Sequence, residues 1–250
     1  MSTIAIANQK GGVGKTTLTF NLAKGLAAQG YQVLVIDNDP QANLTMSLLD
    51  ENADIDANVM TFYDDQPTSV TPQVIEGNLS LIGCDIGLAK IADRTFEVIF
   101  KLRDGLESLN KRHDFTLIDC VPSFGLLSTA SLNAAEWVII PTEAGRSALH
   151  GLNDLFESIG FVKKRLNANL DILGIVLNNV DGRMTKVGTA VEASVRQHYK
   201  DLVFETVIHR TIKFEESPWS QQSIMEYDPS GKGATEFNNL IKEVLKRLGM

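Results

Sequence analysis

The stretch "ANQKGGVGKTT", residues 7–17, is a glycine-rich loop that carries two lysines, Lys10 and Lys15. It follows the apolar run "TIAIAN" (3–8) and opens the segment "KTTLTFNLAKGLAAQG" (15–30), which predicts a strand before the loop and a helix after it. A strand, a glycine loop and a helix in this order are the setting of a phosphate-binding loop. One lysine is enough to hold a phosphate there, so the second lysine needs a separate explanation.

The loop has the residue types that phosphate binding requires. Its glycines let the backbone turn tightly, so that several N–H groups point at one anion, and the start of the following helix adds positive partial charge. We expect the Lys15 ammonium to reach the β- and γ-phosphates of a nucleotide and the Thr16 hydroxyl to bind Mg²⁺. The residues expected to bind the nucleotide are Gly11, Gly12, Val13, Gly14, Lys15, Thr16 and Thr17.

Five further apolar runs of strand length alternate with helix-length segments along the chain. This alternation predicts a single α/β domain over residues 1–250, with a mostly parallel twisted sheet and helices on both faces, as in P-loop NTPases. Such sheets bind ligands at the carboxyl ends of their strands. The polar residues 50–78 are expected to form surface loops and a short helix. The five runs are residues 31–37, 79–83, 115–119, 136–141 and 171–179.

The composition limits the class of protein. With 250 residues, of which 44% are hydrophobic and 22% charged, the chain can bury one sizeable core. No apolar stretch approaches the roughly 18 residues that would span a bilayer, so we expect a soluble, cytoplasmic protein. Acidic residues outnumber Lys plus Arg by 31 to 23, which argues against a surface that binds nucleic acid all over and leaves room for a local basic patch.

Two of the apolar runs end in carboxylates that can complete the phosphate site. "VLVIDNDP" places Asp37 and Asp39 two residues apart, hence on one face of an extended strand, near the glycine loop. The sequence "DNDP" also fits an Asx turn that ends the strand, in which an aspartate side chain accepts a hydrogen bond from the backbone. "FTLIDC" ends in Asp119, as expected of a Walker B aspartate that holds Mg²⁺ opposite the Thr16 hydroxyl.

The octet "KGGVGKTT" departs from the general phosphate-loop pattern because Gln9 stands where the first glycine belongs. It resembles the deviant Walker A motif of the MinD/ParA class of ATPases, and "NQKGGVGKTT" resembles the ParA branch of that class. The resemblance implies a dimer that encloses two ATP molecules, in which Lys15 contacts its own subunit's nucleotide and Lys10 the partner's. A cation supplied in trans stabilises charge that develops on the transferred phosphoryl group.

"DNDPQ", residues 37–41, is similar to the "DxDPQ" switch of the ParA family. The similarity implies that Asp39 positions or activates the attacking water, with Asp37 as a supporting ligand or a hydrogen-bond partner of the loop. The family often has Asp-x-Pro-Pro-Ser after the Walker B strand, whereas this chain has Val121 before Pro122. The resemblance thus implies the catalytic residues Lys10, Lys15 and Asp39, and the Mg²⁺ ligands Thr16, Asp39 and Asp119.

Two further segments extend the resemblance over nearly the whole chain. "GIVLNN" (174–179) resembles the family strand that ends at adenine, which implies that Asn178 or Asn179 binds the base. Residues 207–237 are similar to a family segment that contains the "YDPxSKGA" pattern. Family members usually have an acid near position 145. This chain has Gly145 there, with Glu143 nearby, so no role is assigned at this position.

The resemblance implies an ATPase that uses ATP and Mg²⁺ to partition or position DNA or another large cargo. It further implies a homodimer on ATP binding, nonspecific binding of double-stranded DNA by that dimer, and release when a ParB-like adaptor protein stimulates hydrolysis. The expected location is cytoplasmic and nucleoid-associated, and a membrane partner is not expected. Nonspecific DNA binding depends on Lys and Arg contacts to phosphates. The candidates are Arg210, Lys213, Lys232, Lys242, Lys246 and Arg247.

Two alternatives remain at this point. A MinD-like membrane-positioning ATPase would use the last helix as an interfacial anchor, although the same apolar stripe more often packs into a core. A redox protein like the nitrogenase iron protein would use Cys84 and Cys120, but neither cysteine lies in a glycine-rich loop suited to a shared cluster. The apolar stripe of the last helix consists of Phe237, Leu240, Ile241, Val244, Leu245 and Leu248.

Overall fold

The computed structural model describes residues 2–50, 53–65, 70–110, 112–145, 148–181 and 186–250. The strands are β1 (Ser2–Ile6), β2 (Val33–Asn38), β3 (Gln73–Glu76), β4 (Leu79–Ile82), β5 (Phe115–Cys120), β6 (Trp137–Thr142), β7 (Asp171–Val180) and β8 (Val203–His209). The α-helices are α1 (Lys15–Ala28), α2 (Asn43–Leu48), α3 (Met60–Tyr63), α4 (Val98–Asn110), α5 (Leu126–Ala134), α6 (Ala148–Arg165), α7 (Lys186–Tyr199), α8 (Lys213–Glu216), α9 (Ile224–Tyr227) and α10 (Lys232–Arg247). The 3₁₀-helices are η1 (Ile86–Asp93), η2 (Lys200–Leu202) and η3 (Ser217–Ser220).

The named strands form one eight-stranded sheet in the order β3-β4-β2-β5-β1-β6-β7-β8. Each neighbouring pair is parallel except β3 and β4, which are antiparallel. The α/β prediction is confirmed, and each of the six predicted strands is present. Strands β3 and β8 were not predicted. The loop prediction for residues 50–78 was therefore wrong at β3, an edge strand of alternating half-buried and exposed residues, while the expected short helix is α3.

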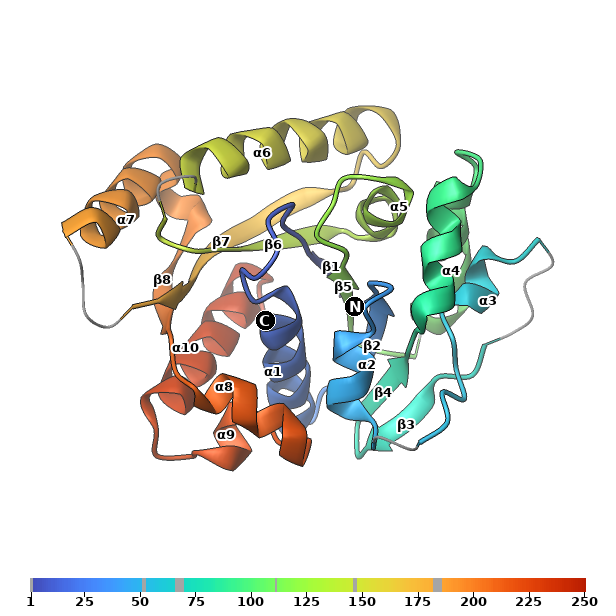
Figure 1. Ribbon diagram of the computed structural model, residues 1–250, viewed down its shortest axis with the longest axis horizontal. Helices are drawn as coiled ribbons and strands as arrows, with labels where there is room; N and C mark the ends of the chain where they lie inside the picture. The colour runs from blue at the N-terminus through green and yellow to red at the C-terminus, as the bar shows by residue number, and fades with distance from the viewer. Residues whose placement is uncertain (1, 51–52, 66–69, 111, 146–147, 182–185) are drawn as a thin grey trace.

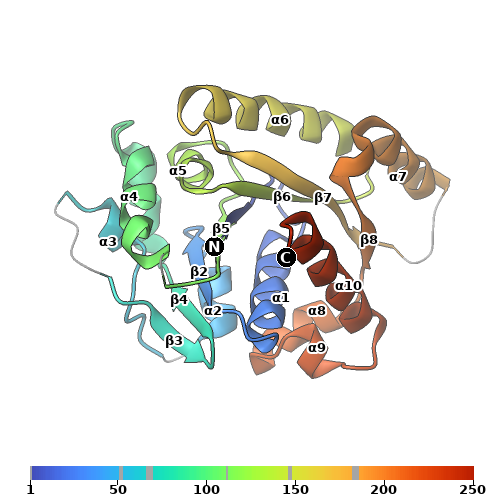
Figure 2. The same cartoon turned by 180° about the vertical axis from the view of Figure 1, so that it is seen from behind.

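Helices cover both faces of the sheet, as predicted (Figure 1). Helices α3 to α7 pack on one face, through a core cluster that includes Leu102, Leu152 and Val195. Helices α1, α2, α9 and α10 pack on the other face, through a cluster that includes Leu22 and Phe237. Figure 2 shows the same two layers from behind. Because both faces are covered, the central strands are apolar on both sides, as their sequences are.

The last helix, α10, belongs to the core. Phe237, Leu240, Ile241 and Val244 are at most 1% exposed, and α10 contacts β8, α1 and α9. Packing of the apolar stripe against the sheet is therefore confirmed, and this stripe is not free to lie in a membrane surface. Within the described parts of the chain, no helix has the length and apolarity needed to cross a bilayer.

The carboxyl ends of β1, β2 and β5 meet at the centre of the sheet. The strand register pairs Asp119 with Ile6 of β1 on one side and with Asp37 of β2 on the other. The glycine loop follows directly after β1 and therefore lies at the same edge. This topology brings together the loop and the carboxylates that the sequence placed 20 to 100 residues apart on the chain.

Candidate nucleotide-binding site

The glycine loop has the backbone conformation that phosphate binding requires. Gly12 and Gly14 have φ angles of 76° and 83°, in the left-handed region that favours glycine. Gly14 also has no room for a side chain, because a Cβ there would lie 2.2 Å from Nδ2 of Asn178. That same Nδ2 donates a hydrogen bond to the Val13 carbonyl at 2.7 Å. Strand β7 thus holds the loop in position from the side.

Lys15 begins α1 and is a buried cation, with 7% of the residue exposed. Burial lowers the pKa of its ammonium, although the neighbouring charges of Asp119 and Asp39 partly oppose this effect. An ammonium that has lost hydration is well suited to bind a phosphate, because the charge-assisted hydrogen bonds replace those to water. Lys15 therefore lies at the start of α1 within reach of the charges of Asp119 and Asp39, and its contact with nucleotide phosphates stays a prediction.

Thr16 and Asp119 are in direct contact, as expected for two groups that share a metal. The Thr16 hydroxyl donates a hydrogen bond to Oδ2 of Asp119 at 2.6 Å. Burial raises the pKa of Asp119 to about 8, and the nearby charge of Asp37 adds to this rise. A cation placed beside these crowded carboxylates would favour their charged forms. The donor set fits Mg²⁺ because nucleotide-bound Mg²⁺ takes one or two protein ligands and otherwise phosphate and water oxygens.

No group of three or more His, Cys, Asp or Glu side chains that could hold a metal by itself is present among the described residues. Thr16 and Asp119 alone offer few oxygen ligands, so a Mg²⁺ ion held there would take its remaining ligands from a nucleotide and water.

Asp37 holds the turn that carries Asp39. Its Oδ2 accepts hydrogen bonds from the backbone N–H and the hydroxyl of Thr45, at 2.8 and 2.7 Å. Its Oδ1 accepts a hydrogen bond from the Asp39 N–H at 3.2 Å. Asp37 thus acts as a hydrogen-bond partner, for the segment 39–45 and not for the glycine loop. Burial raises its pKa.

Asp39 lies at the carboxyl end of β2 in a tight turn. Its Oδ1 accepts a hydrogen bond from the backbone N–H of Gln41 at 3.0 Å, so the turn that the sequence allowed is formed. The residue is 8% exposed, and its charge acts on both Lys15 and Asp119. The turn and the functional assignment are therefore compatible, because the turn holds the carboxylate beside the loop.

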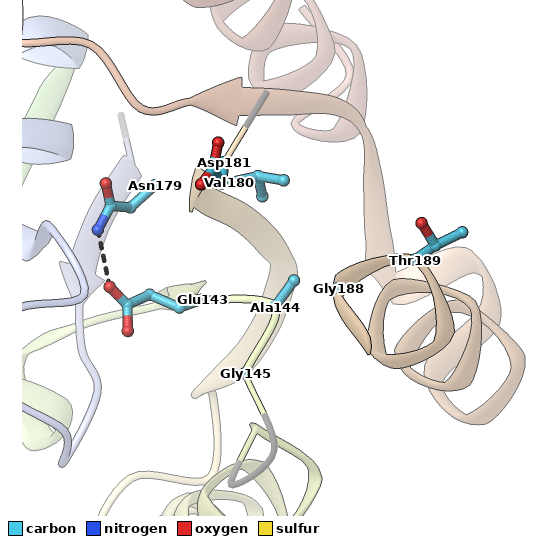
Figure 3. A pocket seen from close by; sticks show the side chains of 8 residues that line it. All are labelled: Glu143, Ala144, Gly145, Asn179, Val180, Asp181, Gly188 and Thr189. Carbon is cyan, nitrogen blue, oxygen red and sulfur yellow. Dashed lines mark hydrogen bonds between the residues drawn. The ribbon is translucent and has the colours of Figure 1, made fainter. Parts of the chain in front are cut away.

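Lys10 makes a contact that the sequence did not predict. Its Nζ lies 2.6 Å from Oε2 of Glu143, which directly follows β6. The other Glu143 oxygen accepts a hydrogen bond from Nδ2 of Asn179 at 2.7 Å (Figure 3). Burial raises the pKa of Glu143, but the hydrogen bonds from Lys10 and Asn179 outweigh it and hold the pKa below its usual value. Glu143 is the site residue that sequence reasoning left without a role.

The two asparagines considered for adenine binding have different positions. Asn178 is 5% exposed and is bound to the glycine loop. Asn179 has a φ of 56° and lines a pocket of about 210 Å³ with Glu143 and Gly188 (Figure 3). Asn178 therefore supports the glycine loop, whereas Asn179 lines the pocket beside Glu143. The assignment of either residue to the base stays a prediction.

Comparison with known proteins identifies the family. The family model described as "AAA domain" matches residues 1–172. The sporulation initiation inhibitor protein Soj of Bacillus subtilis (strain 168) is 38% identical, over 96% of this chain and 97% of Soj. The chromosome partitioning protein ParA of Myxococcus xanthus (strain DK1622) is 36% identical, over 98% of this chain and 88% of that protein. The chain belongs to the ParA/MinD family of partition ATPases.

Solved structures share the fold of this ParA/MinD-type chain. The ATP complex of an aspartate-to-alanine variant of Cyanothece McdA has a TM-score of 0.86 at 25% identity, covering 100% of this chain and 97% of McdA. Cobyrinic acid a,c-diamide synthase from Mycobacterium smegmatis, with bound ADP and magnesium, has a TM-score of 0.83 at 28% identity, covering 100% and 96%. Because the second protein has a different activity, the fold alone does not name the reaction.

The cysteines of this ParA/MinD-type chain do not fit an iron–sulfur cluster. Cys84 and Cys120 are 0% and 1% exposed, and the Cys84 thiol donates a hydrogen bond to the Asp39 carbonyl at 2.9 Å. Burial raises the pKa of both thiols, to about 12 for Cys120. A cluster shared between subunits needs accessible thiolates. The structure therefore argues against the redox alternative.

The basic residues considered for DNA binding fall into two groups. The Arg247 guanidinium donates hydrogen bonds to three backbone carbonyls at 2.8 to 3.1 Å and lies 4.0 Å from the centre of the Phe204 ring. The Arg247 guanidinium is therefore held within the fold, which disfavours Arg247 as a candidate for contacting DNA phosphates. Lys213 forms an ion pair with Asp228 at 2.6 Å. The exposed candidates are Arg210, Lys232, Lys242 and Lys246.

Proposed function

We propose that this protein is an ATP-dependent dimerising ATPase that partitions or positions DNA or another large cargo. Residues 1–250 act as one domain that binds ATP and Mg²⁺, and two copies close over two nucleotides. The observation that carries the proposal is Lys10. It is a second lysine in the glycine loop, and its side chain is 50% exposed and bound to Glu143, whereas Lys15 is buried.

The part of the site that serves the subunit's own nucleotide is formed within one chain. The loop N–H groups and Lys15 hold the β- and γ-phosphates. The Thr16 hydroxyl and the Asp119 carboxylate would hold Mg²⁺, which supplies positive charge between the phosphates. Asp39 accepts a hydrogen bond from the attacking water and orients it toward the γ-phosphorus. Asp39 is held in place by the bond that its N–H donates to Asp37 and by the bond that its carboxylate accepts from the Gln41 N–H.

The part of the site that serves the partner's nucleotide depends on Lys10. In the single chain the ammonium is neutralised by Glu143. In the dimer Lys10 exchanges this carboxylate for the phosphates of the partner's ATP, which carry more negative charge. Two triphosphates brought face to face repel each other, and the two Lys10 side chains offset that repulsion. The same cations stabilise charge on the transferred phosphoryl group, so dimerisation and hydrolysis depend on one residue.

The ATP-bound dimer binds double-stranded DNA nonspecifically, and a ParB-like adaptor protein stimulates hydrolysis and release. This cycle gives a cytoplasmic protein that associates with the nucleoid. At a net charge of −8, DNA binding needs a local basic surface, for which Lys242 and Lys246 on α10 and Arg210 after β8 are exposed. Dimerisation doubles the number of such contacts, which makes the affinity dependent on ATP and on salt.

The proposal is tested by sedimentation with nonspecific duplex DNA and, separately, with anionic liposomes, in ATP and in ADP. The expected result is pelleting with DNA in ATP only, loss of pelleting in Lys10→Ala, and retention in Asp39→Ala, which binds ATP but hydrolyses it slowly. Binding to liposomes without binding to DNA would contradict the proposal. So would equal DNA binding in ATP and ADP.

A further inference from the structure

A groove of about 660 Å³ lies between α2 and η3, apart from the nucleotide site. Met46 of α2 and Trp219 of η3 line it and are 63% and 89% exposed. Leu49 and Ile55 extend the apolar lining. An almost fully exposed tryptophan beside an apolar groove is unusual on a protein surface unless another molecule covers it, and tryptophan is among the residues that contribute most to binding.

One wall of the groove is connected to the switch aspartates. Thr45 lines the groove, and its hydroxyl and N–H both donate hydrogen bonds to Asp37. Asp37 in turn accepts the N–H of Asp39. The Thr45 hydroxyl also accepts a hydrogen bond from the N–H of Cys84, whose thiol donates one to the Asp39 carbonyl. Thr45 of α2 is thus connected to Asp39 by two routes of hydrogen bonds, one through Asp37 and one through Cys84.

The other wall is connected to the helix that carries Lys15. Gln221 lines the groove, and its carbonyl accepts a hydrogen bond from Lys24 of α1 at 2.5 Å. Asn21, also on α1, accepts the N–H of Ile224 at 2.7 Å. Because α1 begins at Lys15, each wall of the groove is hydrogen-bonded to a segment that carries a residue of the nucleotide site: one wall to Asp37 and the other to α1.

The charge around the groove is negative. Asp50 lies in it, Asp54 stands between two lining residues, and Glu215 and Glu216 immediately precede η3; all four are exposed. The lysines of neighbouring elements are engaged elsewhere, since Lys24 pairs with Glu76 and Glu226, and Lys213 pairs with Asp228. The described residues that line the groove include neither lysine nor arginine. Such a surface repels nucleic acid and attracts a basic partner.

We propose that this groove is the docking site of the adaptor protein that stimulates hydrolysis. The adaptor contributes a short segment whose apolar side chains cover Met46 and Trp219 and whose Lys or Arg side chains face the surrounding carboxylates. Seating this segment moves α2, which resets Asp39 for water attack. The inference rests on the proposed function, because it locates the adaptor that the proposed function requires.

The test uses the full chain with ATP, duplex DNA and the ParB-type protein encoded in the same genome. The chain has two tryptophans, so a Trp137→Phe variant leaves Trp219 as the fluorescent reporter. Adaptor binding should shift the Trp219 emission to shorter wavelength, because water leaves the indole. Trp219→Ala should weaken the adaptor's stimulation of ATPase activity, with a half-maximal concentration at least ~10-fold higher and unchanged basal activity.

Charge and position controls separate docking from a general surface effect. The double change Glu215→Lys and Glu216→Lys should slow adaptor association and reduce its dependence on salt. Phe161→Ala and Glu157→Lys alter an exposed aromatic residue and an exposed acid on α6, which covers the opposite face of the sheet, and should leave stimulation unchanged.

The outcomes distinguish failure of the docking proposal from failure of the proposed function. If the adaptor stimulates all variants equally and the Trp219 emission stays unchanged, the groove assignment is wrong and the proposed function stands. An emission shift that depends on protein concentration without adaptor would show a contact between two copies, which also overturns the assignment. If the adaptor fails to stimulate the unsubstituted protein, the proposed function fails, and the docking proposal fails with it.

Discussion

The two lysines of the glycine loop lie in regions of opposite character. Around Lys15 the groups are buried and held by hydrogen bonds within the chain, as in the contact between Thr16 and Asp119. Around Lys10 the side chains are partly exposed, and the Glu143 carboxylate is the ion-pair partner of the ammonium. The first region is completed by folding. The second is held by a contact that another anion can replace, as the proposed dimer requires.

The largest effect is expected for Lys15→Ala. Removing a buried cation that binds phosphate leaves the nucleotide charge uncompensated, so ATP affinity should fall at least ~30-fold. Calorimetric titration with ATP measures this, and Lys90→Ala, which removes an exposed lysine, serves as the control. The fold should survive, since burial already disfavours the charged form of Lys15. An unchanged ATP affinity would contradict the proposal that Lys15, unlike Lys10, binds the nucleotide of its own subunit.

A smaller effect is expected for Asn178→Ala, which tests whether β7 holds the loop. The change leaves the buried Val13 carbonyl without its 2.7 Å hydrogen bond, so the free energy of unfolding should fall by about 1–3 kcal/mol. Urea unfolding measures it. The neighbouring change Asn179→Ala removes a bond to the partly exposed Glu143 and should cost less. Equal losses in both variants would contradict the contrast between the two regions.

Glu143→Gln tests the region around Lys10. It removes the negative charge that Lys10 must leave before it contacts another anion. If the contact between Lys10 and Glu143 competes with dimerisation, its loss should lower the protein concentration at which the ATP-dependent dimer forms. The expected decrease is up to ~5-fold, which corresponds to the free energy of a partly exposed ion pair. Analytical ultracentrifugation measures it, with Glu157→Gln as the control. Weaker dimerisation would show instead that the Glu143 carboxylate itself contributes to the interface.

The smallest effect is a pH dependence of stability. Hydrogen bonds from Lys10 and Asn179 outweigh burial and hold the pKa of Glu143 below its ordinary value, so the contribution of this contact to stability is complete above that ordinary value. This contribution is lost as the pH falls through the lower pKa that Glu143 has in the folded protein. Urea unfolding of the unsubstituted protein and of Glu143→Gln should therefore differ by less than ~1 kcal/mol at neutral pH and converge in acid. A difference that stayed constant with pH would contradict an ionic contact.

The sequence predicted the elements whose pattern is local. The glycine loop, the strands before Asp37 and Asp119 and the helix from Lys15 each have a continuous apolar or periodic signal, and all are present. Strand β8 was missed because its apolar residues come in two short pairs, Val203–Phe204 and Val207–Ile208, with Glu205 and Thr206 between them, and so form no continuous apolar run. Strand β3 was missed because an edge strand of four residues carries little apolar pattern.

The contact made by Glu143 could not be predicted from the local sequence pattern. Lys10 and Glu143 are 133 residues apart in the chain and meet only because β6 pairs with β1. Arg247 shows the reverse case: a basic residue on a helix suggests a surface charge, but here the guanidinium stacks on Phe204 and binds backbone carbonyls near β8. In both cases the role depends on strand order, which the sequence pattern does not state.

The central claim is that two copies close over two nucleotides with Lys10 acting in trans. The most direct test is the mass in solution of the ATP-loaded protein with hydrolysis blocked by Asp39→Ala, measured by light scattering with and without Lys10→Ala. The account predicts a dimer when Lys10 is present and a monomer that still binds ATP when Lys10 is replaced. A monomer in both cases, or a dimer in both, would contradict it.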